Sequence, residues 1–368
     1  MTDTTYRFRY WSYNRQLLGK RGTNLNQVLK DILGVYSSHP SAPLSLRARM
    51  RSFSEQAFYN LDKNKLAYRV PAMRLSAYIL SRENANLVFA ATIPSASAPI
   101  WEKRYSQKGR VIPKENYNDW KKQVLKLTTN PLTAKEIKIA SDIPDEKIKL
   151  VLNRMTFEGR LLRVGAKSLR SNIISYVSTK EWAKGNFIQA DNQKALGWLA
   201  GEYLRAFGPV RIKDFQWWTG VTASRAKAAV STQKTTEIDD GYLLLSKDIN
   251  KFEKFKLQTK DSLDILPQWD SYTMGYAPDG RERFVSQDMQ DKIYGSLGAT
   301  TGNALGTVLV NGMAHASWSS QFKGTTMMVK LNMFEKTSGK LNAEITNQFN
   351  EIAKFLKAKS IVIEKNKS

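Results

Sequence analysis

Residues 131–164 place two short helices and a strand in immediate succession, which restricts the fold more than any other stretch does. Thr133 and Glu136 have the spacing of a capping box, which starts a helix. Pro144 separates this helix from a second one, and Gly159 ends the second one before a strand at 161–164. The second helix carries one apolar stripe, formed by Ile148, Val151, Leu152 and Met155. Helix, tight turn, helix and β-ribbon predict a winged helix-turn-helix, used either on DNA or only for packing.

One looser copy of this pattern precedes residues 131–164 and another follows them, so that the chain holds a first, a middle and a third copy. In the first, Asn24 caps a helix, a loop at 36–43 leads to a short helix at 44–50, and a β-ribbon follows at 65–80. In the third, helices at 195–230 precede a strand at 242–245. We therefore expect three tandem winged helix-turn-helix modules. Their expected boundaries are 1–112, 113–188 and 189–262.

The pattern changes to short strands with frequent glycine after Leu263. Asn311-Gly312 between two apolar runs predicts a tight hairpin, and residues 327–333 predict a further strand. Leu341, Ile345 and Phe349 mark a closing helix before a lysine-rich tail. The expected fold class is α+β, with a small antiparallel β-barrel and its closing helix at 263–368.

The charge of the chain indicates a polyanionic partner. Lys and Arg number 57 against 33 Asp and Glu, which gives a net charge of +24. Neutralising phosphates releases condensed counterions, so double-stranded DNA is the first candidate, and an inert basic surface is the alternative. The candidate DNA-binding residues are Arg47, Arg49, Arg51, Arg69 and Arg74 in the first module and Arg225 and Lys227 in the third.

The middle module is a weaker candidate for DNA contact. Leu150 and Phe157 lie on the face of the helix at 145–158 opposite its apolar stripe, so this helix is expected to pack on a neighbouring domain. In the third module, Trp217 and Trp218 are expected in the core, with stacking on bases as the alternative.

Residue usage excludes several classes of protein. The chain has no cysteine and only two histidines, His39 and His315, so we expect no disulfide, no metal site and no cofactor. No apolar run approaches the ~18 residues of a spanning helix, and the first residues lack a signal peptide. We expect no membrane partner and a cytoplasmic, nucleoid-associated protein.

Motifs in five places occur in one order along the chain. They are Arg69–Arg74 (RVPAMR), Tyr203–Pro209 (YLRAFGP), Phe215–Gly220 (FQWWTG), Leu266–Asp270 (LPQWD) with Gly275-Tyr276, and Val308–Gly312 (VLVNG). Together they resemble the bacterial winged-helix DNA glycosylases, which excise alkylated purines and unhook interstrand crosslinks. The resemblance covers nearly the whole chain. It implies three winged helices and a β-barrel that form a concave basic face, with alkylated or crosslinked DNA as partner. We expect a monomer.

The catalytic positions depart from that family. Its enzymes carry Gln–apolar–Gln or Gln–apolar–Asp after the second helix, which is thought to position the attacking water, and here the triplet is Tyr36-Ser37-Ser38. A family histidine in the wing is replaced by Tyr78. The candidate catalytic residues are therefore Tyr36 and Ser38, the neighbouring His39, which titrates near neutrality, and Asp270 as a substitute carboxylate. A loop histidine before proline also fits a structural role.

Three functions remain open at this point. The first is a DNA-binding member of the glycosylase superfamily that recognises alkylated or damaged DNA, with excision weakened, altered or lost. The second is an active monofunctional alkylpurine glycosylase that uses substitute residues. The third is a winged-helix transcription regulator or a structural protein. Against a dimeric regulator, the chain has several modules instead of one reading head and a dimer helix.

Overall fold

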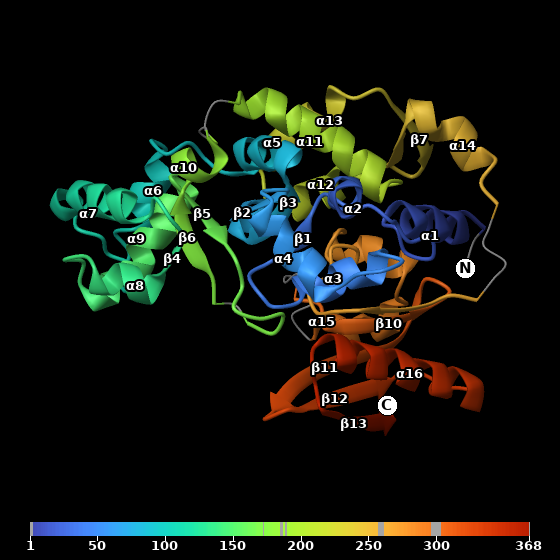
Figure 1. Cartoon of the computed structure of the whole chain (residues 1–368). Helices are drawn as coiled ribbons and strands as arrows, with labels where there is room; N and C mark the ends of the chain where they lie inside the picture. Colours follow the sequence, from blue (N-terminus) through green and yellow to red (C-terminus); the bar gives the residue numbers. More distant parts are fainter. Residues whose placement is uncertain are drawn as a thin grey trace.

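The computed structural model describes residues 3–171, 173–184, 187, 190–256, 261–295 and 303–367. The chain is an α+β protein in which one order of elements occurs three times and a C-terminal sheet follows (Figure 1). That order is a helix, a short extended segment, two helices and a hairpin. The first segment (blue in Figure 1) lies between the second (green), the third (yellow-green) and the C-terminal sheet (red).

The first segment follows helix α1 (Asp3–Arg15). Its elements are α2 (Leu25–Asp31), β1 (Val35–Tyr36), α3 (Ala42–Arg49), α4 (Glu55–Lys63), β2 (Ala67–Pro71) and β3 (Ala77–Ser81). Asn24 caps α2, as expected, because its side-chain oxygen accepts from the Gln27 amide (3.0 Å). The short strand β1 pairs antiparallel with β3, so the loop after α2 is bound to the hairpin.

The second segment shares its sheet with the first. Its elements are α7 (Lys114–Leu127), β4 (Leu132–Thr133), α8 (Ala134–Ile139), α9 (Asp145–Phe157), β5 (Leu161–Val164) and β6 (Ser175–Ser178). The predicted capping box of Thr133 and Glu136 is confirmed, and Gly159 has a φ of 68°. The strands form one sheet in the order β1-β3-β2-β5-β6-β4, joined by the pairing of Arg69 with Arg163. This sheet crosses the boundary expected at residue 112.

Two helices connect the first segment to the second: α5 (Arg82–Thr92) and α6 (Pro99–Arg104). Helix α6 lies outside the helices expected from the sequence. The helix forms there because Trp101 is buried and its ring stacks on Phe157 of α9, with ring centroids 4.9 Å apart. The prediction that α9 buries a second face is therefore confirmed.

The third segment repeats the order with a single-residue bridge in place of the short strand. Its elements are α10 (Thr179–Ala183), α11 (Asn192–Phe207), α12 (Ile212–Thr219), α13 (Ala223–Ser231), β7 (Thr235–Asp239), β8 (Tyr242–Leu245) and α14 (Ile249–Glu253). Val210 bridges to Leu243 of the hairpin, as β1 and β4 pair with theirs. Trp218 is buried and stacks on Tyr203, which confirms its assignment to the core, whereas Trp217 is half-buried.

The C-terminal part is an open sheet with a crossover helix. Its elements are β9 (Leu263–Leu266), α15 (Gln290–Tyr294), β10 (Gly306–Val310), β11 (Met313–Lys323), β12 (Thr326–Met333), α16 (Gly339–Phe355) and β13 (Ser360–Lys367), in the sheet order β13-β12-β11-β10-β9. Short 3-10 turns lie at Met73–Leu75, Ser246–Asp248, Pro278–Arg283 and Gln287–Met289. The predicted Asn311-Gly312 hairpin is confirmed by the pairing of Val310 with Met313.

The expectation of a closed β-barrel is wrong. The described strands β9 and β13 are the two edges of the sheet and do not pair with each other. The expected lysine-rich tail forms β13 instead, which runs parallel to β12. A parallel return needs a crossover, and α16 supplies it and packs on one face of the sheet, where Phe349 meets Trp318. Among the described residues, no helix is long and apolar enough to cross a membrane.

Candidate functional site

The register of β1 and β3 brings together Tyr36 and Tyr78, two of the positions to which the resemblance drew attention. Tyr36 is the cross-strand partner of Tyr78, and their ring centroids lie 5.8 Å apart at 88°. Tyr36 is half-buried and Tyr78 is buried. Burial raises the pKa of Tyr78 above its usual value, so this side chain is a neutral phenol at pH 7. It can donate a hydrogen bond there and is no base.

A third aromatic ring completes the group. Trp269 has a left-handed φ of 56°, which turns its half-buried ring against Tyr36 (centroids 5.5 Å apart) and against His39 (4.6 Å). Its indole nitrogen donates to the Asn303 side chain (3.1 Å). We call Tyr36, Tyr78, Trp269 and His39 the aromatic cluster. The sequence analysis did not select Trp269 as a candidate, and the signal available for it was its place in the LPQWD motif.

His39 occupies the edge of the aromatic cluster. Burial lowers the pKa of its imidazole, so the neutral form predominates at pH 7. Its Nδ1 atom is buried and has no hydrogen-bond partner within the described part of the chain. A neutral imidazole can accept a proton or a hydrogen bond, so His39 retains the chemistry of a weak base. Within the described ranges, no group of three or more His, Asp or Glu side chains could hold a metal ion.

Ser38 lies at the surface beside the hairpin. Its Oγ accepts a hydrogen bond from the Ala77 amide of β3 (3.1 Å), and the Ser37 amide donates to the Ala77 carbonyl (2.8 Å). These two bonds hold the triplet against the strand that carries Tyr78. The hydroxyl of Ser38 therefore accepts a hydrogen bond that fixes the loop against β3, next to the aromatic rings.

Asp270 lies in the core, which corrects its assignment as a catalytic carboxylate. Its two oxygens accept from both terminal nitrogens of Arg49 at 2.8 and 2.7 Å, and both side chains are 0% exposed. Arg49 also donates to the backbone carbonyls of Gln16 (3.0 Å) and Ser45 (2.9 Å). Neither side chain can reach DNA or a water on the surface. Arg49 is therefore not a DNA-contacting residue in this structure.

The other arginines of the first segment differ in exposure. Arg69 is buried in the sheet and pairs with Asp62 (3.4 Å), so it too is withdrawn as a DNA-contacting residue. Arg47 is half-buried, with its guanidinium 5.9 Å from the Phe355 ring centroid. Arg51 and Arg74 are exposed. These two remain available to a partner at the surface.

Arg74 joins the hairpin of the first segment to helix α12 of the third. It has a left-handed φ of 54° at the hairpin tip, and its guanidinium lies 4.3 Å from the Trp217 ring centroid. Gly220, which ends α12, would carry its Cβ 3.2 Å from the Arg74 side chain, so the two segments touch closely. The contact puts an exposed cation and a half-buried indole beside each other.

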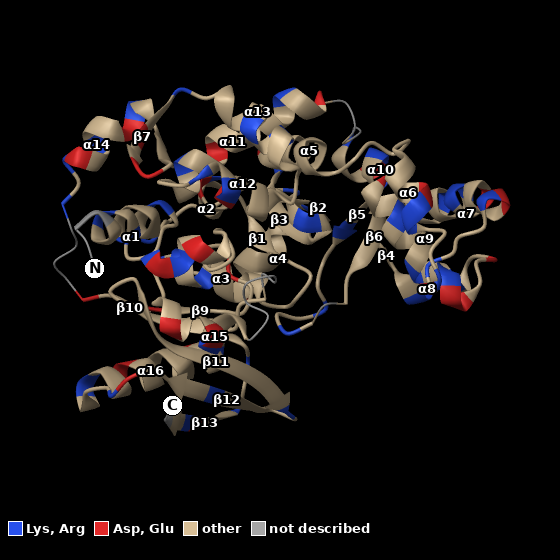
Figure 2. Cartoon of the chain, turned by 180° about the vertical axis from the view of Figure 1, so that it is seen from behind, with Lys and Arg blue, Asp and Glu red and all other residues tan. Residues whose placement is uncertain are grey.

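The two basic candidates of the third segment are both exposed on α13. Arg225 donates to the Asn192 side chain (2.5 Å) and more weakly to the Ala91 carbonyl (3.4 Å), so part of its capacity is used within the chain. Lys227 follows it on the same helix. Figure 2 shows Lys and Arg on all three segments and on the C-terminal sheet.

Comparison with solved structures identifies the class of fold. The Streptomyces sahachiroi DNA glycosylase AlkZ superposes with a TM-score of 0.74 over 99% of this chain and 100% of that chain, at 14% sequence identity. At that identity the likeness shows a shared fold.

The sequence comparison then gives the family. The model of the family described as "DNA glycosylase AlkZ-like" matches residues 31–355, which include the aromatic cluster. The chain therefore belongs to the AlkZ-like DNA glycosylase family, in agreement with the resemblance noted from its motifs. No curated protein matches the sequence.

Proposed function

We propose that this protein binds double-stranded DNA and recognises alkylated bases, with base excision weakened or lost. The observation that carries the proposal is the pairing of Tyr36 with Tyr78. These residues stand at the two positions where the family resemblance implies a water-holding amide and a histidine.

DNA binding is supported by the charge and by the repeated elements. A net charge of +24 favours a polyanion, and we interpret each helix–strand–helix–helix–hairpin repeat as a winged helix. The exposed cations Arg51, Arg74 and Lys227 are the proposed phosphate contacts. Arg225 can add to them from the same helix as Lys227.

Weak excision follows from the chemistry of the aromatic cluster. Cleavage of an N-glycosidic bond passes through an oxocarbenium-like state, which needs an oriented water and a compensating negative charge. Tyr78 is a neutral phenol, Ser38 accepts from the backbone, and Asp270 faces Arg49. None of these groups is an exposed carboxylate.

A slow, His39-dependent glycosylase is the second candidate. The buried Nδ1 of His39 has no partner among the described residues, and burial lowers the pKa of this imidazole, so it is available as a neutral base. Replacing His39 with glutamine would abolish such activity, whereas a purely binding protein would show no excision before or after the change.

Recognition of an alkylated purine is supported by the aromatic faces. N7-alkylguanine carries a positive charge, and electron-rich rings attract a cation by about 0.5–2 kcal/mol, depending on desolvation. Tyr36 and Trp269 are both half-buried, so their rings are accessible in part. The aromatic cluster suits binding of such a lesion better than its hydrolysis.

The test is a pair of binding curves at one salt concentration, on duplexes with and without one N7-alkylguanine. We expect tighter binding to the lesion, and Tyr36→Ala should reduce this preference more than it reduces affinity for undamaged DNA. Tyr6→Ala is the control, because Tyr6 is a 41% exposed tyrosine on α1. Equal affinity of the native chain for both duplexes would leave only sequence-independent DNA binding.

A further inference from the structure

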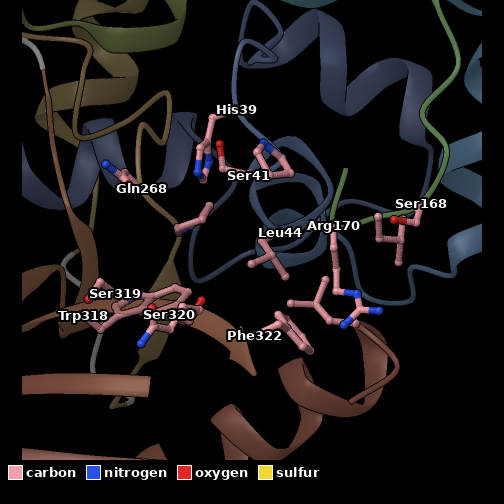
Figure 3. A pocket seen from close by; sticks show the side chains of 15 residues that line it. His39, Ser41, Leu44, Ser168, Arg170, Gln268, Trp318, Ser319, Ser320 and Phe322 are labelled. Atoms are coloured by element: carbon pink, nitrogen blue, oxygen red, sulfur yellow. The ribbon is translucent and has the colours of Figure 1, made fainter. Parts of the chain in front are cut away.

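A cavity of about 450 Å³ lies next to the aromatic cluster, between the first segment and the C-terminal sheet. Its upper edge in Figure 3 is formed by His39 and Ser41, and Trp318, Ser320 and Phe322 of β11 lie across from them. This volume is within the range of preformed small-molecule sites. His39 lines the cavity and also contacts Trp269, so the cavity adjoins the aromatic cluster directly.

Two buried polar atoms at the cavity find no hydrogen-bond partner among the residues that the structure describes. They are the Oγ of Ser41, a residue only 3% exposed, and Nδ1 of His39. Ser41 is the N-cap of α3, where a serine hydroxyl normally accepts from the helix, yet its side chain makes no capping bond. Leaving buried polar groups unpaired is costly, so both atoms point to a hydrogen-bonding occupant of the cavity.

The lining sets the chemistry of that occupant. Leu44, Leu169 and Leu356 supply apolar surface, and Trp318 and Phe322 add aromatic surface. The described lining residues include no Asp or Glu and one arginine, Arg170, whose guanidinium lies 4.1 Å from the Phe322 ring centroid. A cationic ligand would find no counter-charge, whereas an uncharged planar heterocycle could stack on the rings and pair with Ser41 and His39.

We propose that this cavity is a subsite for an uncharged nucleobase, entered from the aromatic cluster past His39. The inference rests on the proposed binding of DNA and extends it, because a base extruded from a duplex needs a pocket that stacks on it and pairs with its edge. The aromatic cluster then meets the cationic lesion, and the cavity receives a neutral base. That base comes either from the bound strand or as a free base or nucleoside.

The probe is 1,N6-ethenoadenosine, which is uncharged, planar and fluorescent. Its anisotropy should rise as the native protein is added. Ser320→Trp should weaken this binding at least about tenfold, because the new ring fills the cavity from an exposed position on β11. Met328→Trp is the matched control, since Met328 lies outside the lining, on neighbouring β12 opposite Gln321.

Ser41→Ala should weaken binding about three- to tenfold through one lost hydrogen bond.

A second arm distinguishes the two sources of the base. If the base comes from the strand, a duplex containing ethenoadenine should bind more tightly than its undamaged counterpart, and Ser320→Trp should remove the difference. If the source is a free base, only the free nucleoside occupies the subsite, and the two duplexes bind with equal affinity. Either result supports the subsite.

Failure of the subsite can be told apart from failure of the proposed function. No nucleoside binding, or binding that Ser320→Trp leaves unchanged, would overturn the subsite and show only a hydrated cavity, while salt-dependent binding of undamaged duplex would still stand. Loss of duplex binding in the native chain would overturn the proposed function as well. Thermal unfolding of each variant verifies that it is folded.

Discussion

Trp269 and Asp270 are neighbours in the sequence and belong to two regions of opposite character. Trp269 turns outward into the aromatic cluster, where its half-buried ring meets Tyr36 and His39. Asp270 turns inward to a fully buried ion pair with Arg49, in which every terminal guanidinium nitrogen has a partner. The polar atoms of the inner pair are bonded, whereas the outer region keeps partly accessible rings and a His39 Nδ1 that has no partner in the described part of the chain. The comparison teaches that a charged residue in this part of the chain can be buried in the core while its uncharged neighbour is accessible to a partner.

The largest expected effect is on the inner region. Asp270→Asn leaves the buried Arg49 charge without its counter-charge, which should cost about 3–5 kcal/mol of unfolding free energy. Denaturant unfolding measures it. Glu351→Gln, which removes one partner of an exposed ion pair with Lys354, is the control and should leave stability unchanged. A small loss for Asp270→Asn would contradict the structural role of the pair.

The next largest effect is expected when the aromatic cluster is given the two amides of the motif that the resemblance implies. Tyr36→Gln combined with Ser38→Gln restores the two amides that the family resemblance associates with the attacking water. We expect single-turnover excision of N7-alkylguanine to rise by up to about 10²-fold over the native chain. This is the lower end of the rate enhancement that one positioned acid or base contributes. Robust native excision that Ser38→Ala does not alter would show that the water is held elsewhere.

A smaller effect is expected from Trp269, whose ring contacts two other members of the aromatic cluster. Trp269→Ala removes the contacts with both Tyr36 and His39, so the preference for a cationic lesion should fall by about tenfold, within the range of cation–π attraction. Affinity for undamaged duplex should stay within about twofold, because no phosphate contact is lost. Equal losses on both duplexes would assign Trp269 to general DNA binding.

The smallest effect separates exposed from buried arginines. Arg51→Ala and Arg74→Ala should each flatten the log–log salt dependence of duplex binding by about one unit, roughly one per lost phosphate contact. Arg47, half-buried beside Phe355, should contribute less. The slope is measured by anisotropy from low to moderate salt. A slope that neither exposed arginine changes would place the phosphate contacts on other residues.

Local features of the fold could be predicted because they depend on neighbouring residues. Asn24, Thr133 and Asn311-Gly312 act through bonds or dihedral angles within a few positions, and each forms the predicted cap or turn. Strand β13 escaped prediction because its register comes from pairing with β12 across the crossover helix. The assignments of Arg49, Arg69 and Asp270 failed for a similar reason, since burial is a property of the whole chain.

The sequence by itself determined the three repeats, the excess of positive charge and the Tyr36-Ser37-Ser38 triplet after the second helix, because composition, caps and motifs are local in the chain. Only the tertiary structure decided which of these groups face a partner. It set Tyr36 opposite Tyr78, brought Trp269 from more than 200 positions away, and buried Arg49 against Asp270. Long-range pairing selects one register and one burial pattern among many compatible with the same local signals, and that selection separates the aromatic cluster from the core.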